Sequence, residues 1–424
     1  NKVSTEIKEG VQLTTKGDIS LISENDLKGK NLMFNIEDSN TAAVGASVAY
    51  IDILNKTYTN IGNNVVIKVQ VDYAGYLLLK ALATENLMSI LFGAGNSDKA
   101  AINASVAYKN ITSDTRATIG NGSTIKVSHL DMLAEDHTKM MGVIGGITIS
   151  KKVGIGGASD VNEFNKKVYA HIGNSKVNVK YNLTAKVNSE DYILSIVVGL
   201  GGGSNAAVTG SVPVTTIKND LDAHIDSDED ILVGRDLVVE ATQNDTLIIY
   251  AGAISGSKTA AVGLSATNVI ISGQIKAYLD VKNLKTNSVT ILTNKKDKFS
   301  FGSVAGSVSG SISVTGAELT ILVNTVMSSY IADDSNLSIT KSLTIKANHE
   351  IDSTSSTGQL AGASTTAIGA GVLVYKLELT VNSYVGNNVT VLNELEGPII
   401  IVADSKNKLL FVVVGVAASG TTSV

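Results

Sequence analysis

The stretch Ile61-Gly62-Asn63-Asn64-Val65-Val66-Ile67-Lys68-Val69 joins a tight-turn sequence to an alternating segment. Gly and Asn are the residues that most readily adopt the backbone conformations of tight turns. After the turn, apolar residues recur at every second position, which gives the segment one inward and one outward face. This combination predicts a β-strand entered through a turn.

The same signature recurs along the whole chain. Its anchor is one aliphatic residue directly before the turn, and the anchors are Ile7, Ile61, Ile119, Ile172, Ile225, Leu279, Ile331 and Val385. The differences between successive anchors are 54, 58, 53, 53, 54, 52 and 54 residues. The chain is therefore built from repeats of about 54 residues.

Other segments keep the same phase. Strands of small residues precede many anchors, as in 42–48, 100–106, 206–212 and 260–265, and apolar runs into Gly, Ala and Ser close the units, as in 193–203 and 304–310. A unit of this size cannot bury its apolar face alone, whereas stacked copies can. We predict an all-β parallel solenoid in which each unit forms two or three coils. Some sixteen coils at about 4.8 Å each would make a rod of roughly 75 Å.

The repeats predict one continuous solenoid over residues 1–424. The expected divisions are a partial repeat 1–38, then repeats 39–96, 97–150, 151–203, 204–256, 257–310, 311–363 and 364–420, and the start of another at 421–424. Because both ends lie inside a copy, we expect the native chain to continue in both directions. An export signal is expected outside this segment, and no apolar stretch reaches the roughly 18 residues of a membrane-spanning helix.

The segment from Tyr76 to Phe92 is ambiguous. It is rich in Leu, Ala, Glu and Met, which favour a helix. Its phase matches strands in other repeats, so we predict a strand and keep a short helical insertion as the alternative.

Composition narrows the partners and the chemistry. The net charge is -5 with scattered Lys residues, which argues against nucleic acid as a partner. The absence of Cys excludes disulfides, thiolate metal sites and cysteine nucleophiles. The absence of Trp and an aromatic content of 4% weaken the case for a sugar-stacking platform.

The small-residue strands, the Ile-Gly-Asn turns and the Gly/Ala/Ser-rich closures together resemble the passenger regions of large type V autotransporter adhesins, especially those of the fusobacterial type. They resemble filamentous-haemagglutinin-like solenoids more loosely. The likeness covers nearly the whole chain. It implies a right-handed parallel β-helix displayed outside the cell, with further solenoid and a C-terminal outer-membrane barrel in the full-length protein. No segment here matches such a barrel.

The five histidines do not form a metal-binding motif. His171 and His224 occupy the repeat position held elsewhere by Tyr278, Tyr330 and Tyr384, which indicates a packing or surface position. The others, His129, His137 and His349, lack the spacing of a zinc site. We predict no catalytic residue, no metal ligand and no cofactor.

The acidic run consists of Asp220, Asp222, Asp226, Asp228, Glu229 and Asp230. It suggests a calcium loop, but Ile231 and Leu237 stand where an EF-hand needs Gly and Glu. We interpret the run as a solvated turn, with calcium binding as the alternative.

Two glycine-rich strings are also interpreted structurally. The string 252–259 lacks the Gly-Lys pair of a phosphate-binding loop, and 154–157 is not followed by a helix. Both are predicted to be tight turns or close backbone contacts.

The function predicted from these patterns is that of a surface adhesin passenger or stalk without catalysis. Its partner would be a protein or glycan on a host or bacterial cell, and no ligand-binding residue is assigned. A passive spacer carrying a distal binding domain is the first alternative. A β-helix enzyme acting on polysaccharide is the second.

Overall fold

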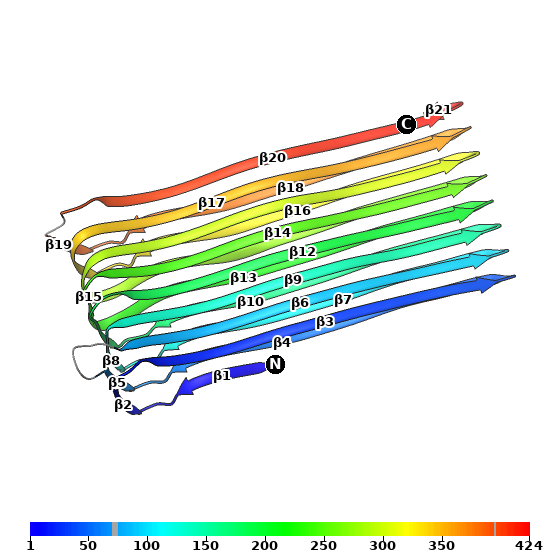
Figure 1. Ribbon diagram of the computed structural model, residues 1–424. Helices are drawn as coiled ribbons and strands as arrows, with labels where there is room; N and C mark the ends of the chain where they lie inside the picture. The colour runs from blue at the N-terminus through cyan, green and yellow to red at the C-terminus, as the bar shows by residue number, and fades with distance from the viewer. Residues whose placement is uncertain (70–74, 394–395) are drawn as a thin grey trace.

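Residues 1–69, 75–393 and 396–424 are described in a computed structural model, where they form stacked coils of β-strand (Figure 1). Every pairing between the described strands is parallel, as in Ala42 with Ala100. The predicted all-β parallel solenoid is therefore confirmed. The described residues contain no helix that could cross a membrane.

Each coil contributes one long strand to each of two facing sheets and a short strand to a narrow third sheet. The first sheet contains β1 (Lys2–Ile7), β4 (Ala42–Ile61), β7 (Ala100–Ile119), β10 (Val153–Ile172), the beginnings of β13 (Ala206–Val233) and β15 (Ala260–Ser309), β16 (Ile312–Ile331), β18 (Thr366–Val385) and β21 (Thr422–Ser423). The second sheet contains β3 (Ile19–Ser39), β6 (Tyr76–Ser97), β9 (His129–Ser150), β12 (Leu183–Gly203), β14 (Asp236–Ser257), the end of β15, most of β17 (Asn336–Ala363) and β20 (Ile399–Ser419). The narrow sheet contains β2 (Gln12–Thr15), β5 (Val66–Val69), β8 (Thr124–Val127), β11 (Lys176–Val179), β19 (Thr390–Asn393) and short parts of β13, β15 and β17.

The register shows how much chain makes one coil. The smallest offset in the first sheet is 52 residues, between Ala260 and Ile312, and the largest is 58, between Ala42 and Ala100. A single coil therefore uses a whole repeat, and the prediction of two or three coils per repeat is wrong. The long strands are about twenty residues each, so one repeat is used up in a single coil and the eight strands of the second sheet rise only about 34 Å. The predicted 75 Å rod is replaced by a broad slab.

The glycine of the Ile-Gly-Asn turn leaves room for the asparagine side chain of the preceding coil. The backbone N–H of Asn121 donates to the Asn63 side-chain oxygen at 2.9 Å, and Asn174 repeats this contact with Asn121 at 3.0 Å. A Cβ added at Gly120 would lie 2.5 Å from that same Asn63 oxygen. Glycine therefore makes room for an asparagine ladder that links successive coils.

The segment 76–92 lies within β6, so the strand prediction is confirmed and the helical alternative is wrong. Leu77, Leu79 and Ala81 are fully buried at alternate positions. Pairing with β3 and β9 along the whole length overrides the helix propensity of these residues.

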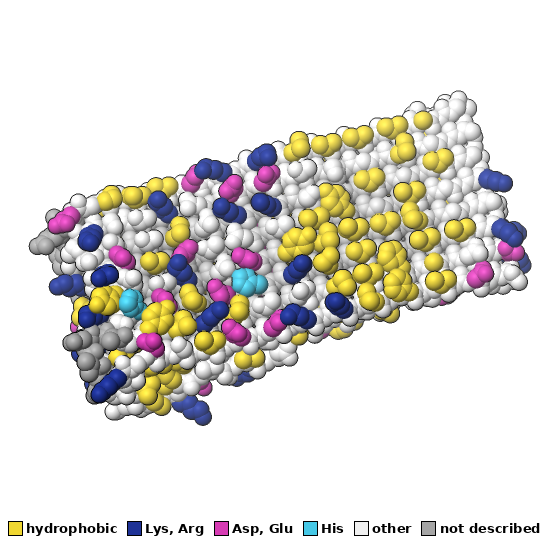
Figure 2. Space-filling model, viewed as in Figure 1, with side chains coloured by type: hydrophobic (Ala, Val, Ile, Leu, Met, Phe, Trp, Pro, Cys, Tyr) yellow, Lys and Arg dark blue, Asp and Glu magenta, His cyan; other side chains and the backbone are white. Residues whose placement is uncertain are grey.

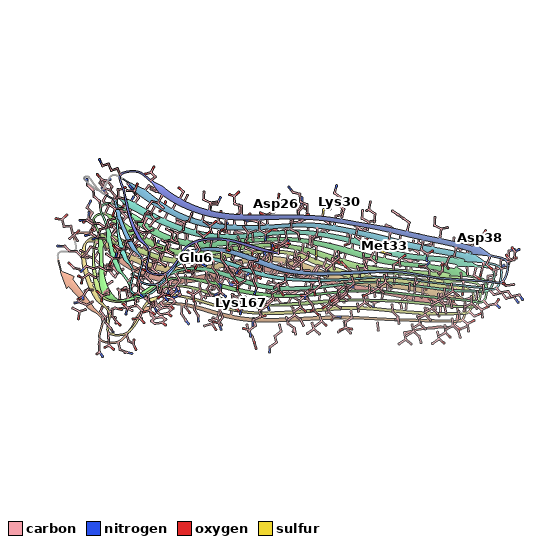
Figure 3. All side chains as sticks on the ribbon, turned by 90° about the horizontal axis from the view of Figure 1, so that it is seen from below. Glu6, Asp26, Lys30, Met33, Asp38 and Lys167 are labelled. Atoms are coloured by element: carbon pink, nitrogen blue, oxygen red, sulfur yellow. The ribbon has the colours of Figure 1, made fainter. Side chains whose placement is uncertain are left out.

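The two ends of each coil are packed differently. We call the ten residues on either side of a two-residue turn, such as Asp98-Lys99, the turn half, and the rest of the coil the short-strand half. The short-strand half encloses a large aliphatic core. In the turn half the sheets are in backbone contact, since a Cβ at Gly146 would lie 2.4 Å from the Gly157 carbonyl oxygen. Figure 3 shows the slab tapering toward this end, with Asp26, Lys30 and Asp38 projecting from one sheet and Lys167 from the other.

Candidate functional site

A polar depression of about 540 Å³ crosses the outer face of the second sheet. In it, His137 Nδ1 lies 3.6 Å from Glu190 Oε2, and Lys139 Nζ lies 5.7 Å from the centre of the Tyr192 ring. Two lining carboxylates, Glu85 and Asp191, belong to the buried set of residues and project inward. Among the described lining residues Glu190 is thus the one exposed carboxylate, whereas glycoside hydrolysis ordinarily needs two. The depression is suited to polar contacts.

A cluster of buried ionisable side chains with short contacts lies inside the solenoid, in the short-strand half. Asn55 accepts a 2.5 Å hydrogen bond from Asn25 and donates another of 2.5 Å to Glu85. Ser113 then donates to Asp136 at 2.5 Å. These side chains come from alternate sheets, and together they begin a buried ladder that follows the solenoid axis.

Lysine is the centre of the next segment of the ladder. Lys166 Nζ lies 2.7 Å from Asp136 and 2.5 Å from Asp191, and all three side chains are almost completely buried. Asn219 donates to the other oxygen of Asp191 at 2.7 Å. Burial alone would lower the pKa of Lys166, but the Asp136 and Asp191 carboxylates raise it above its usual value.

A second lysine continues the ladder toward the C-terminus. Lys295 Nζ lies 2.6 Å from Asp245 and 2.8 Å from Asp297. The His349 ring is 2.9 Å from the other oxygen of Asp297. Burial would raise the pKa of Asp297, but Lys295 and the hydrogen bond with His349 hold it below its usual range.

Two carboxyl groups in the ladder have pKa values raised so far that they hold a proton up to near neutral pH. Burial, followed by the Asp136 carboxylate, raises the pKa of Glu85 to about 7. Burial also raises the pKa of Asp245 to about 7, despite the nearby Lys295 ammonium group. The ladder therefore holds more carboxyl groups than cations because some of them are neutral.

A separate buried ion pair lies at the border of the turn half. Lys109 Nζ is 2.7 Å from Asp160, and both side chains are fully buried. Ser195 donates to Asp160 at 2.7 Å. A Cβ at Gly142 would lie 2.2 Å from Asp160 and 2.7 Å from Lys109, so this glycine provides the space for the pair.

The two histidines of the repeated aromatic position form part of a ring stack. His171 and His224 have centroids 4.1 Å apart, and the stack continues through Tyr278, Tyr330 and Tyr384 at 4.6, 4.8 and 4.9 Å. This agrees with the predicted packing position. Burial, and then the neighbouring His224, lowers the pKa of His171 to about 4. His171 is therefore neutral at physiological pH.

The remaining histidines are dispersed. His129 lies between Tyr76 and Tyr181, with ring centroids at 6.0 and 5.0 Å. His137 lies on the outer face and His349 lies in the buried ladder. Within residues 1–69, 75–393 and 396–424, no three His, Cys, Asp or Glu side chains gather in a way that could hold a metal ion.

Most of the acidic run is strand, so its interpretation as a turn is wrong except at one irregularity between Ser227 and Asp230. Asp222 contacts His224 at 2.8 Å, and Asp230 contacts Lys176 at 3.2 Å. The side chains thus point to different neighbours along the outer surface. This dispersion explains why the run does not converge on one cation.

The glycine-rich strings are strand residues in close backbone contact. A Cβ at Gly154 would lie 2.4 Å from the Gly202 carbonyl oxygen, and Gly252 and Gly256 lie within β14. The prediction of close backbone packing is confirmed for 154–157. The predicted turn in 252–259 is limited to Lys258-Thr259, between β14 and β15.

Sequence reasoning missed the buried ladder, although the chain contains a signal for it. Glu85, Thr138, Asp191, Asp245 and Asp297 are consecutive register partners at one repeat position. Their neighbours in sequence on either side face outward. Polar residues recurring on the inward phase of an alternating strand would have indicated an internal polar column.

Comparison with known proteins gives no relative: the chain matches no family model, no curated protein and no solved structure. The fold and the arrangement of side chains therefore carry the functional argument.

Proposed function

We propose that this chain is a non-catalytic section of an extracellular bacterial adhesin, in which the broad faces of the solenoid contact a protein or glycan on another cell. The observation that carries the proposal is the regularity of the outer surface. Long strands joined by short connections and paired in register place exposed side chains in columns across both sheets, and Figure 2 shows the face of one of them. Columns of this kind suit extended binding contacts better than an enclosed reaction site.

The placement of the ionisable groups supports the same function. The closest carboxylate and lysine groups, such as Asp191 and Lys166, satisfy each other in the interior, where a substrate has no access. The exposed depression at His137 and Glu190 offers polar contacts but a single carboxylate. These observations favour attachment over hydrolysis.

The proposal is tested by adding the purified chain to bacterial and host cells and measuring attachment. Inhibition of attachment that depends on chain concentration is expected. A chain that leaves attachment unchanged would instead favour the passive spacer, which the short connections also allow.

The polysaccharide-acting enzyme has its own test. Release of reducing sugar from a panel of glycans is expected to equal the rate without protein. Release that disappears in Glu190→Gln would refute the non-catalytic proposal and would locate the reaction in the depression.

A further inference from the structure

The second sheet has a band without charge along its turn half. The last ten residues of seven successive strands contain no Asp, Glu, Lys, Arg or His; the segments are 88–97, 141–150, 194–203, 248–257, 300–309, 354–363 and 410–419. Figure 2 shows this face, with apolar side chains gathered over the right half and charged side chains over the left half.

A β-sheet ordinarily turns its large apolar residues toward the core, but in this band most of them face outward. Most of its inward positions hold Gly, Ala, Ser and Thr, such as Gly199 and Ser255, with a few buried apolar residues such as Ile144 among them, whereas many of its outward positions hold large aliphatic residues. Ile254 and Val308 are 58% and 59% exposed. We call the following outward residues the apolar face: Ile90, Phe92, Val143, Ile147, Ile149, Leu194, Ile196, Val198, Leu200, Ile248, Tyr250, Ile254, Val304, Val308 and Leu360.

The size of the apolar face exceeds what a monomer ordinarily exposes. Ten residues along a strand span about 33 Å, and the six strands that carry the listed residues span about 24 Å, giving a sheet area of about 800 Å², including the small polar and glycine positions between them. The largest apolar patch of a typical monomeric protein is about 300–600 Å². A stable protein interface buries about 800 Å² on each partner, so this face alone is large enough for one.

The shape and borders of the face indicate the kind of partner. Parallel strands make a flat surface, and flat sheets pack face to face about 10 Å apart. Charged residues limit the face on both sides: Lys139 and Glu190 precede the band in β9 and β12, and Lys151 and Lys152 form the turn after β9. A flat, apolar and bordered surface is complementary to another copy of itself.

The turn half of the first sheet is less suitable for self-docking. It is also largely apolar, but it carries the exposed carboxylate of Glu318, which accepts a 2.9 Å hydrogen bond from Thr320. Burial of that carboxylate against an identical surface would bring two like charges into an apolar contact.

We propose that the apolar face docks on the apolar face of a second copy of this chain, in a two-fold symmetric dimer centred near β14. Two-fold dimers are the commonest way for identical surfaces to pair. The inference goes beyond attachment to cells, since the dimer would form in solution without any cell or ligand.

The first test is sedimentation equilibrium of the whole chain at micromolar concentrations. A mass twice the 44.0 kDa of the chain is expected. The double variant Ile254→Lys/Val308→Lys is expected to weaken dimerisation by at least about a hundredfold, because two lysines would be buried without partners. The control Leu264→Lys changes an aliphatic residue of the first sheet that is 49% exposed, and it should leave the dimer intact.

A second measurement does not depend on the folding of the lysine variants. Because the chain has no Cys, the single-cysteine variants Ile254→Cys and Leu264→Cys can each be labelled with pyrene. Excimer fluorescence is expected from the label at 254 and not from the label at 264. A monomeric wild-type chain, excimer at 264 instead of 254, or a monomer that floats with phosphatidylcholine vesicles would each overturn the proposal.

Discussion

The turn half and the short-strand half of each coil have the same backbone but opposite distributions of side chains. In the short-strand half, large aliphatic residues such as Ile119 and Leu130 fill the interior and charges cover the outside. In the turn half, glycines such as Gly146 and Gly199 bring the sheets into backbone contact and most of the large aliphatic residues lie outside. The same parallel register is therefore compatible with two kinds of core. In the short-strand half the sheets are far apart and the core is thick, and in the turn half they touch and the core is thin.

The difference also separates two functions within the coil. The thick half can bury a charged ladder because its sheets are far enough apart to hold lysine and carboxylate side chains between them. In the thin half such space occurs where Gly142 admits the Lys109–Asp160 pair, and most of the larger aliphatic residues of this half lie outside, where they are available for contacts with another molecule. Substitutions placed in one half or the other are expected to distinguish the two kinds of core.

Removing the central cation of the ladder should damage the thick half most. Lys166→Met would leave the buried carboxylates of Asp136 and Asp191 without their cation. We expect a loss of about 3–5 kcal/mol in the free energy of unfolding, measured by urea denaturation. Lys167→Met, one residue away and on the outer surface, is the control and should change stability by less than about 0.5 kcal/mol. Equal effects from both substitutions would contradict a buried ladder.

Adding one methyl group between the sheets should damage the thin half. In Gly146→Ala the new Cβ would lie 2.4 Å from the Gly157 carbonyl oxygen, so the sheets would have to move apart. We expect a loss of about 3 kcal/mol. Gly157→Ala is the matched control, because a Cβ there meets nothing within 4 Å. If the control is as unstable as Gly146→Ala, the two sheets are not in backbone contact.

The ladder also predicts how stability depends on pH. The folded pKa of Glu85 is raised to about 7 from its usual 4.5, so its contribution to stability is fully present below about 4.5 and is lost as the pH rises through about 7. Glu85→Gln keeps the shape and the hydrogen bonds without titrating. We expect the variant to gain about 2 kcal/mol relative to wild type between pH 4.5 and pH 8. Denaturation midpoints of both proteins across this range give the measurement, and parallel curves would show that Glu85 does not titrate in the interior.

The ring stack predicts the smallest effect. The pKa of His171 is lowered to about 4 from 6.5, so its contribution is present above about 6.5 and is lost as the pH falls through about 4. His171→Tyr would extend the tyrosine column and should stabilise the protein at pH 4 by about 1 kcal/mol relative to wild type. An NMR titration of wild-type His171 gives an independent check, and a midpoint near 6.5 would rule out a buried stack.

The repeat, the parallel stacking and the strand over 76–92 could be predicted because they depend on local patterns. Period-two alternation and turn residues such as Gly62 and Asn63 report on the backbone of each copy. The number of coils per repeat could not be predicted in this way. Apolar and polar residues alternate in the same way in one 20-residue strand and in two short strands. The two arrangements differ only in whether the chain turns midway, and the alternation does not show this.

The parallel stacking of similar units follows from the residues alone, because each unit has apolar residues at alternate positions that it cannot bury without its neighbours. Which of the two alternating sets of side chains faces inward depends on the packing of the folded chain, which places Lys166 inside and Ile254 outside. The physical reason is the spacing between the sheets. Where they touch through glycine there is room inside only for small side chains, and where they separate even a lysine can be enclosed with its carboxylate partners.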